Sequence, residues 1–285
     1  INHSARSIQA SVILHRETRR TLGRVDVLFP ERVGHAARDA SDDARSAELP
    51  TGTSGFVLAS HSGYLQALHP AELWKLEHAQ RASPITVRIE IPVGAFVIPG
   101  SRLATVWPAQ ALDEGLEHAV RNAFALGSER TIEQDVEFGI VVIADIALRA
   151  LSPGINDPTT ATQCIDRLTE ILAALGLREP PSEARQSPDG MVRLLMRTVT
   201  FSGAVALAFD QIRLFGAENP VIARRLLVSL GELAAVVPVS LHEALRAQGN
   251  AVLNQSRRSI GDTNALRSIE LLEATVFERR AGRAS

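Results

Sequence analysis

The chain has 285 residues, a length that at roughly 150 residues per domain predicts two domains, or one domain with a sizeable appendage. Hydrophobic residues make up 45% of it and charged residues 22%, which is typical of a globular protein and excludes collagen, a disordered chain and a coiled-coil rod. With 30 basic and 32 acidic residues, the formal charge of -2 is too balanced to favour nucleic acid as a partner. The single cysteine, Cys164, excludes a disulfide framework.

Residues 1–24 predict a basic helix, because arginines there outnumber the one acidic residue, Glu17. Two interpretations remain open. One is a solvated surface helix; the other is a juxtamembrane helix, since the cytoplasmic flanks of membrane spans are rich in Lys and Arg. The chain begins at Ile1 rather than Met, so we expect a preceding portion to be missing. No run of about 20 apolar residues is present, so we expect this region to be water-soluble.

Short apolar runs separated by turn residues predict β-strands between residues 52 and 107. We expect strands at 55–59, 64–68, 85–91, 95–98 and 103–107, with a type II turn at Pro99-Gly100 and a short helix at 70–80. Residues 31–48 are polar and predict a loop or a loose helix. Together these elements indicate a small β-barrel or half-barrel over residues 31–108.

A carrier of a covalent cofactor is excluded by the placement of lysine. Residues 92–106 resemble the barrel-sandwich motif of biotinyl and lipoyl domains, which carry the cofactor on a lysine at a hairpin tip. The only lysine of this chain, Lys75, lies in the predicted helix instead. No cofactor is therefore expected.

Capping signals predict a mainly helical region after Trp107. We expect helices at 113–126, stopped by Gly127; 131–151, opened by a Thr131/Gln134 capping box; 157–176, opened by Asp157 and Pro158; 201–215; one opened by Asn219-Pro220; one opened by Ser240 and Glu243; and 262–280. Residues 178–190 predict a loop, and 191–198 a short strand. The predicted fold is α+β, mainly α, with parts at 1–30, 31–108 and 109–285.

Common catalytic motifs are missing from the sequence. It has no phosphate loop, no dinucleotide-binding glycine fingerprint and no nucleophile elbow. His242-Glu243 lacks the second histidine of a zinc protease helix, and the eight histidines have no ligand spacing, so no zinc site is expected and no residue is nominated as a metal ligand on these grounds.

The helix of 131–151 carries the first candidate polar cluster. It is apolar nearly all round, so we expect it to be central and buried, with Asp145 and Arg149 as an ion pair four positions apart. A buried charge must be paired or neutralised. The pair either ties neighbouring helices together or, with Asp135, faces a ligand or a subunit boundary.

Two further segments carry polar candidates. Residues 152–158 are explained as a helix connector, or alternatively as an anion site formed by the first amides of the next helix. Asp210 and Arg213 form either a salt bridge near a helix end or a second part of the Asp145 cluster. The candidate ligand-binding residues are Arg130, Gln134, Asp135, Asp145, Arg149, Asn156, Asp157, Asp210 and Arg213.

The blocks RTIEQDVEFG, DIALRALSPGINDPTTA and AFDQIRLFG, after the basic opening INHSARSIQAS, resemble the bacterial predicted-membrane-protein family called domain of unknown function 2254. The resemblance spans nearly the whole chain. It implies that a transmembrane bundle precedes this region and that the membrane is a partner. The family brings no established activity. This chain departs from the expected pattern at Val141 and Val142, where polar residues would follow the Phe-Gly pair.

Three hypotheses follow. The favoured one is a non-enzymatic cytoplasmic domain of an inner-membrane protein, which forms homo-oligomers or regulates the membrane part. The second is the vestibule of a channel or transporter, which requires a ring-shaped oligomer. The third is an enzyme that holds a divalent metal or an anionic substrate with Asp135, Asp145, Asn156 and Asp157.

Overall fold

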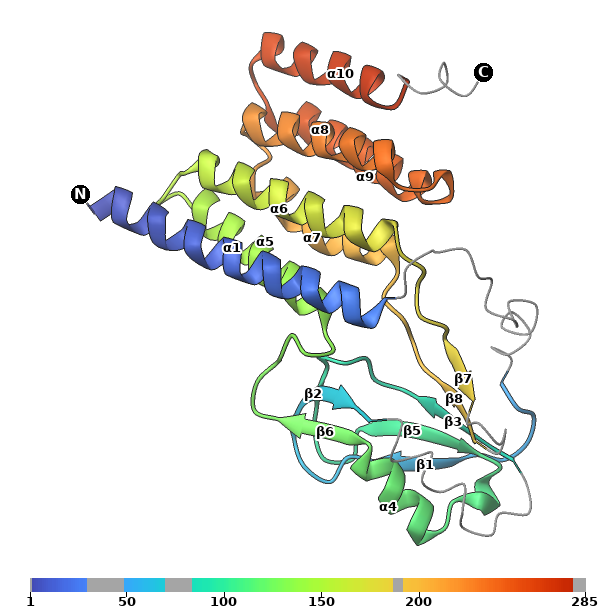
Figure 1. Cartoon of the computed structure of the whole chain (residues 1–285). Coiled ribbons are helices and arrows are strands. Elements are labelled where there is room, and N and C mark those ends of the chain that lie inside the picture. The colour runs from blue at the N-terminus through green and yellow to red at the C-terminus, as the bar shows by residue number, and fades with distance from the viewer. Residues whose placement is uncertain (1, 30–48, 70–83, 187–191, 279–285) are drawn as a thin grey trace. The chain divides into compact units, whose positions relative to one another are not determined.

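The computed structural model describes residues 2–29, 49–69, 84–186 and 192–278 (Figure 1). The chain forms two compact units. The helical unit comprises Ile1–Arg32, Val136–Glu179 and Val199–Ser285, and the β unit comprises Val33–Asp135 and Pro180–Thr198. This division differs from the predicted boundaries, because the N-terminal helix belongs to the helical unit and residues 109–135 and 180–198 belong to the β unit.

The helical unit encloses one apolar core. Its elements are α1 (Asn2–Leu28), α5 (Val136–Leu151), α6 (Pro158–Gly176), α7 (Phe201–Phe215), α8 (Pro220–Val236), the 3-10 helix η3 (Val239–Leu241), α9 (His242–Ser259) and α10 (Thr263–Glu278). Ile140, Leu168, Phe209 and Leu230 come from four different helices and are all fully buried in that core. The mainly helical α+β class is as predicted.

Capping chemistry sets the starts of two of these helices as predicted. The Asp157 carboxylate accepts hydrogen bonds from the Thr160 amide at 3.1 Å and its hydroxyl at 2.6 Å, and Pro158 opens α6. The Asn219 side chain accepts from the Val221 amide at 3.0 Å at the start of α8. These side chains satisfy amides that a helix start leaves without an intrahelical partner.

Two predicted capping boxes are wrong. α5 begins at Val136, and the Gln134 side chain instead bonds the backbone of Leu68, accepting from its amide at 2.9 Å and donating to its carbonyl at 3.2 Å. Gln134 therefore binds the backbone at the end of a strand and does not cap the start of α5. Ser240 lies inside η3, and α9 follows it without a side-chain cap.

The β unit contains two sheets rather than the predicted barrel-like sheet. A five-stranded sheet has the order β1-β5-β3-β8-β7 and a three-stranded sheet the order β4-β2-β6. The strands are β1 (Gly55–Leu58), β2 (Gly63–Leu68), β3 (Ile85–Ile89), β4 (Phe96–Val97), β5 (Arg102–Trp107), β6 (Phe124–Gly127), β7 (Ala184–Gln186) and β8 (Val192–Leu195), with η2 (Ala109–Ala111) and α4 (Glu114–Asn122). The first five predicted strands and the strand within 191–198 are confirmed.

Long-range pairing explains where the prediction of this unit is wrong. Residues 124–127 were expected to end a helix, but they pair antiparallel with β2, Leu126 opposite Leu65. The predicted loop of 178–190 contains β7, which pairs antiparallel with β8. β8 in turn pairs in parallel with β3, more than 100 residues earlier in the chain. The predicted loop of 31–48 and helix of 70–80 lie outside the described residues.

Gly94 allows close contact with a buried ion pair in the β unit. Arg130 donates from Nε at 3.1 Å and from Nη2 at 2.7 Å to Oδ2 of Asp135, whose side chain is only 2% exposed. Gly94 has φ of +86°, and a Cβ there would lie 2.1 Å from that oxygen. Gly100 has the same φ with open space around it, in the predicted turn.

Gly94→Ala should therefore lower the free energy of unfolding of the β unit far more than Gly100→Ala. Both variants meet the strain of a positive φ, about 1–2 kcal/mol, but only the first also displaces a buried ion pair, for a total of about 3 kcal/mol or more. Urea unfolding followed by tryptophan fluorescence reports this unit, because both tryptophans, Trp74 and Trp107, belong to it. Equal losses in the two variants would contradict the assignment.

Candidate functional site

Arg213 is the predicted candidate that lies beside a pocket. It sits in the last turn of α7, which Thr200 caps at the start by accepting from the Gly203 amide and which Gly216 follows as C-cap. Its Nη2 donates to the Asp210 carboxylate at 3.2 Å, so the predicted salt bridge is present. The Arg213 side chain is 17% exposed, and its Nε is buried without a hydrogen-bond partner. An unsatisfied buried donor costs about 1–3 kcal/mol of stability, so this N–H favours the binding of a hydrogen-bond acceptor.

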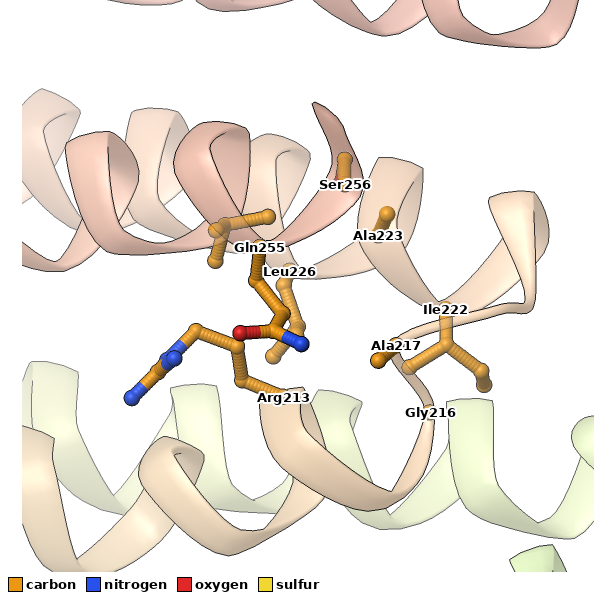
Figure 2. Close-up of a pocket in the computed structure, with 9 residues that line it drawn as sticks. Arg213, Gly216, Ala217, Ile222, Ala223, Leu226, Gln255 and Ser256 are labelled. Atoms are coloured by element: carbon orange, nitrogen blue, oxygen red, sulfur yellow. The ribbon is translucent and has the colours of Figure 1, made fainter. Parts of the chain in front are cut away.

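The pocket lies where α7, α8 and α9 meet (Figure 2). Figure 2 shows the Gln255 side chain reaching from α9 toward Arg213 on α7. The lining residues are Arg213, Gly216, Ala217, Ile222, Ala223, Leu226, Val252, Gln255 and Ser256. The space measures about 10 Å³, which is room for about one water molecule. Pockets for organic ligands measure about 300–1,000 Å³, so this one suits a water or a monoatomic anion.

The polar candidates in the β unit hold the chain between β6 and α5. Arg130 and Asp135 form the ion pair against Gly94, and Gln134 bonds Leu68. Gln66 donates from Nε2 to the Glu129 carbonyl at 2.8 Å and so fixes the same segment. Every polar contact named here joins two parts of the same chain, so these residues have a structural role in the β unit.

Asp145 and Arg149 do not lie in the core. Both are exposed, and they form no ion pair in the part of the chain that the structure describes, so the expected buried pair is wrong. α5 is central, as predicted, but its buried positions include Ile140, Ile143 and Ala147, which leaves the Asp145 side facing solvent. Solvent screens such charges, so they contribute little to stability.

The turn between α5 and α6 keeps its candidates together. Asn156 has φ of +46°, a left-handed conformation that asparagine tolerates better than most residues. Asp157 caps α6 and so occupies an amide that an anion would need. Asp135 belongs to the other unit. The described residues contain no group of three or more His, Cys, Asp and Glu side chains placed to hold a metal ion.

The pocket residues Gln255 and Ser256 were missed by the sequence analysis. They are polar residues in a helix, and only the packing of α9 against α7 brings them to Arg213. Arg193 on β8 was missed as well; its Nε and Nη2 are buried without hydrogen-bond partners. An arginine inside a short strand was the available signal for a buried cation.

Asp157→Ala should destabilise the helical unit by about 1 kcal/mol, the usual cost of losing an N-cap. Asp145→Ala is the matched control, and a change within about 0.5 kcal/mol is expected for this exposed position. Urea unfolding followed by circular dichroism at the helical wavelength measures both. A larger loss in the Asp145 variant would restore the buried cluster that the sequence predicted.

The Cys164 thiol should be unreactive in the folded protein. Burial, and then the charges of Asp157 and Asp166, raise its pKa to about 12. In the unfolded chain the thiol ionises near pH 9, so the unfolded state loses this proton first and stability falls as pH rises from about 9 toward 12. The loss at pH 10 is about 1 kcal/mol. Cys164→Ala should remove this part of the pH dependence, and thiol labelling of native protein at pH 8 would contradict it.

Comparison with known proteins gives the chain its family. The model of the family described as Predicted membrane protein (DUF2254) matches residues 1–232. Uncharacterised proteins Rv1290c of Mycobacterium tuberculosis and Mb1321c of Mycobacterium bovis are each 31% identical over 268 residues, which is 92% of this chain and 50% of the relative. No solved structure matches. This chain thus spans about half the length of these relatives.

The helices within the described ranges also bear on the membrane context. None of the helices there is long and apolar enough to cross a bilayer. The family match covers well over half of the chain. The chain therefore belongs to the DUF2254 family of predicted membrane proteins.

Proposed function

We propose that this chain is the cytoplasmic, membrane-proximal regulatory domain of a bacterial inner-membrane protein. In this proposal α1 is the element that couples the membrane part to the helical unit. The observation that carries it is the packing of α1, which has one face in the helical core and a basic face outside. Figure 1 shows α1 lying along α5 and α6. The family membership supports the membrane context.

The inner face of α1 is part of the core of the helical unit. Leu14, Val25 and Phe29 are buried there, at spacings that place them on one side of the helix. The hydroxyls of Thr18 and Thr21 donate back to carbonyls one turn earlier, both at 2.7 Å, so these polar groups are satisfied inside the contact. A displacement of α1 would therefore move α5 and α6 with it, because close-packed cores transmit strain.

The outer face of α1 is basic. The side chains of Arg16 and Arg20 are 65% and 54% exposed, and both contact the mostly buried carboxylate of Glu17. One acid shared by two arginines leaves a net positive face. Arginines beside a membrane span mark the cytoplasmic side, which supports the proposed topology.

Self-association belongs to the same proposal, as a route by which the domain regulates the membrane part. Leu271 on α10 is 63% exposed and would be available for an apolar contact between copies.

A labelling experiment in cells that express the natural protein tests the topology. Arg16→Cys places a thiol on the exposed face of α1, where the arginine side chain is 65% exposed. The unaltered natural protein, in which Cys164 is buried, gives the background labelling that is subtracted. A membrane-impermeant maleimide should label the variant in inverted membrane vesicles and not in intact spheroplasts. Labelling of intact spheroplasts would place the domain on the other side and overturn the proposal.

A further inference from the structure

One long side of α1 is exposed. The helix has 27 residues, a length of about 40 Å. Its exposed positions recur at helical spacing, so they share one side of the helix. This outer face comprises Val12, Arg16, Arg19, Arg20, Gly23 and Val27. It extends over about 22 Å, from Val12 with 63% of its surface exposed to Val27 with 70% exposed.

The outer face carries positive charge that α1 itself does not neutralise. Arg16 and Arg20 share the carboxylate of Glu17, whose side chain is only 10% exposed. Arg19 is exposed and forms no ion pair within the described residues. Asp26, the exposed acid among the described side chains of this helix, is bound by Arg178 at 2.5 Å.

The two helices that α1 contacts do not cancel this charge. α5 exposes Asp145 together with Arg149, and on α6 the exposed Arg167 and Glu170 pair with each other at 2.8 Å. Among the described side chains of α1, α5 and α6, five arginines and three acids are exposed. Because α5 and α6 each contribute one of either sign, the surplus of two positive charges lies on α1.

This charge favours a negatively charged partner over a second copy of the chain. Two outer faces in contact would bring the arginines of one copy against those of the other, and like charges oppose such an interface. The partner must also accept apolar groups, since Val12, Ile13 and Val27 are exposed beside the arginines. An anionic bilayer offers phosphates to arginines and an apolar layer to valines at the same surface.

The positions of the arginines favour a helix that lies along such a surface. If α1 stood upright on its first residues, Arg16 would be about 20 Å from the surface. The Debye length in physiological salt is about 8 Å, so charges at that distance are largely screened. A helix that lies flat brings all three arginines of the outer face within reach of the lipid phosphates.

We infer that the outer face of α1 lies flat on an anionic phospholipid surface. This inference rests on the proposed function, because it assigns the side of α1 that faces the membrane. The opposite side of α1 is buried in the core of the helical unit. A change at the lipid surface would therefore reach α5 and α6 directly through this helix.

Vesicle cosedimentation of the 285-residue chain tests the inference. The vesicles contain phosphatidylcholine with phosphatidylglycerol, or phosphatidylcholine alone. Arg19→Gln with Arg20→Gln should weaken binding to the anionic vesicles at least about tenfold, because it removes two charges from the contact. Arg246→Gln with Arg258→Gln is the matched control, since it removes two charges from exposed positions of α9 and should leave binding nearly unchanged.

A fluorophore on the outer face separates contact from long-range attraction. An environment-sensitive dye on Val27→Cys should shift its emission to shorter wavelength on anionic vesicles, because the side chain enters the interfacial region. The same dye on Val221→Cys, at a 55% exposed position of α8, should not shift. The native Cys164 is buried, so the unaltered chain gives the background that is subtracted.

Failure of the unaltered chain to bind anionic vesicles would overturn the inference. Equal losses in the two double variants, equal shifts at the two dye positions, or equal binding to phosphatidylcholine alone would do the same. Labelling of Arg16→Cys in intact spheroplasts would instead reject the proposed topology, whatever the vesicles show. Labelling on the expected side without vesicle binding would reject this inference alone.

Discussion

The contact of α1 with α5 and α6 is the constraint on which the helical unit and its proposed role depend. Leu14, Val25 and Phe29 share one core with α5 and α6, and the threonines between them satisfy their hydroxyls within the helix. Burial of side chains of this size contributes about 1.5–3 kcal/mol each. A helix held so firmly acts as part of the domain, and its outer arginines keep a fixed orientation relative to the helices that it contacts.

Local chemistry was sufficient to predict the elements whose partners are close in sequence. The starts of α6 and α8 followed from Asp157 and Asn219, because a cap needs only the next few residues. The capping box predicted at Gln134 had the same kind of local signature, and that prediction was wrong. The Gln134 side chain bonds the backbone of Leu68 instead, far away in the sequence. The helix predicted through residues 124–126 was wrong for the same reason. Pairing with β2 determines the structure of residues 124–127, and no local sequence pattern indicates that pairing.

The candidate site shows the same limit more strongly. The Asp210–Arg213 bridge was predictable from helical spacing, but the pocket beside it depends on Gln255 of another helix. The nearly all-apolar sequence of α5 correctly indicated a central helix. It also suggested that Asp145 is buried, whereas Asp145 lies on the exposed side of that helix. A helix packed on several neighbours still has one open side, and the polar residues define it.

The small size of the pocket contrasts with the exposure of the apolar side chains at the turn between α7 and α8. A space for about one water beside Arg213 gives little selectivity for a substrate, whereas the adjacent Leu214, Phe215 and Val221 offer a large apolar area. Tight packing of Gly216 on Ile222 keeps that area in place, so its binding would cost little conformational entropy. The pocket beside Arg213 is therefore too small for an organic substrate, and the exposed apolar side chains next to it are the larger feature of this part of the helical unit.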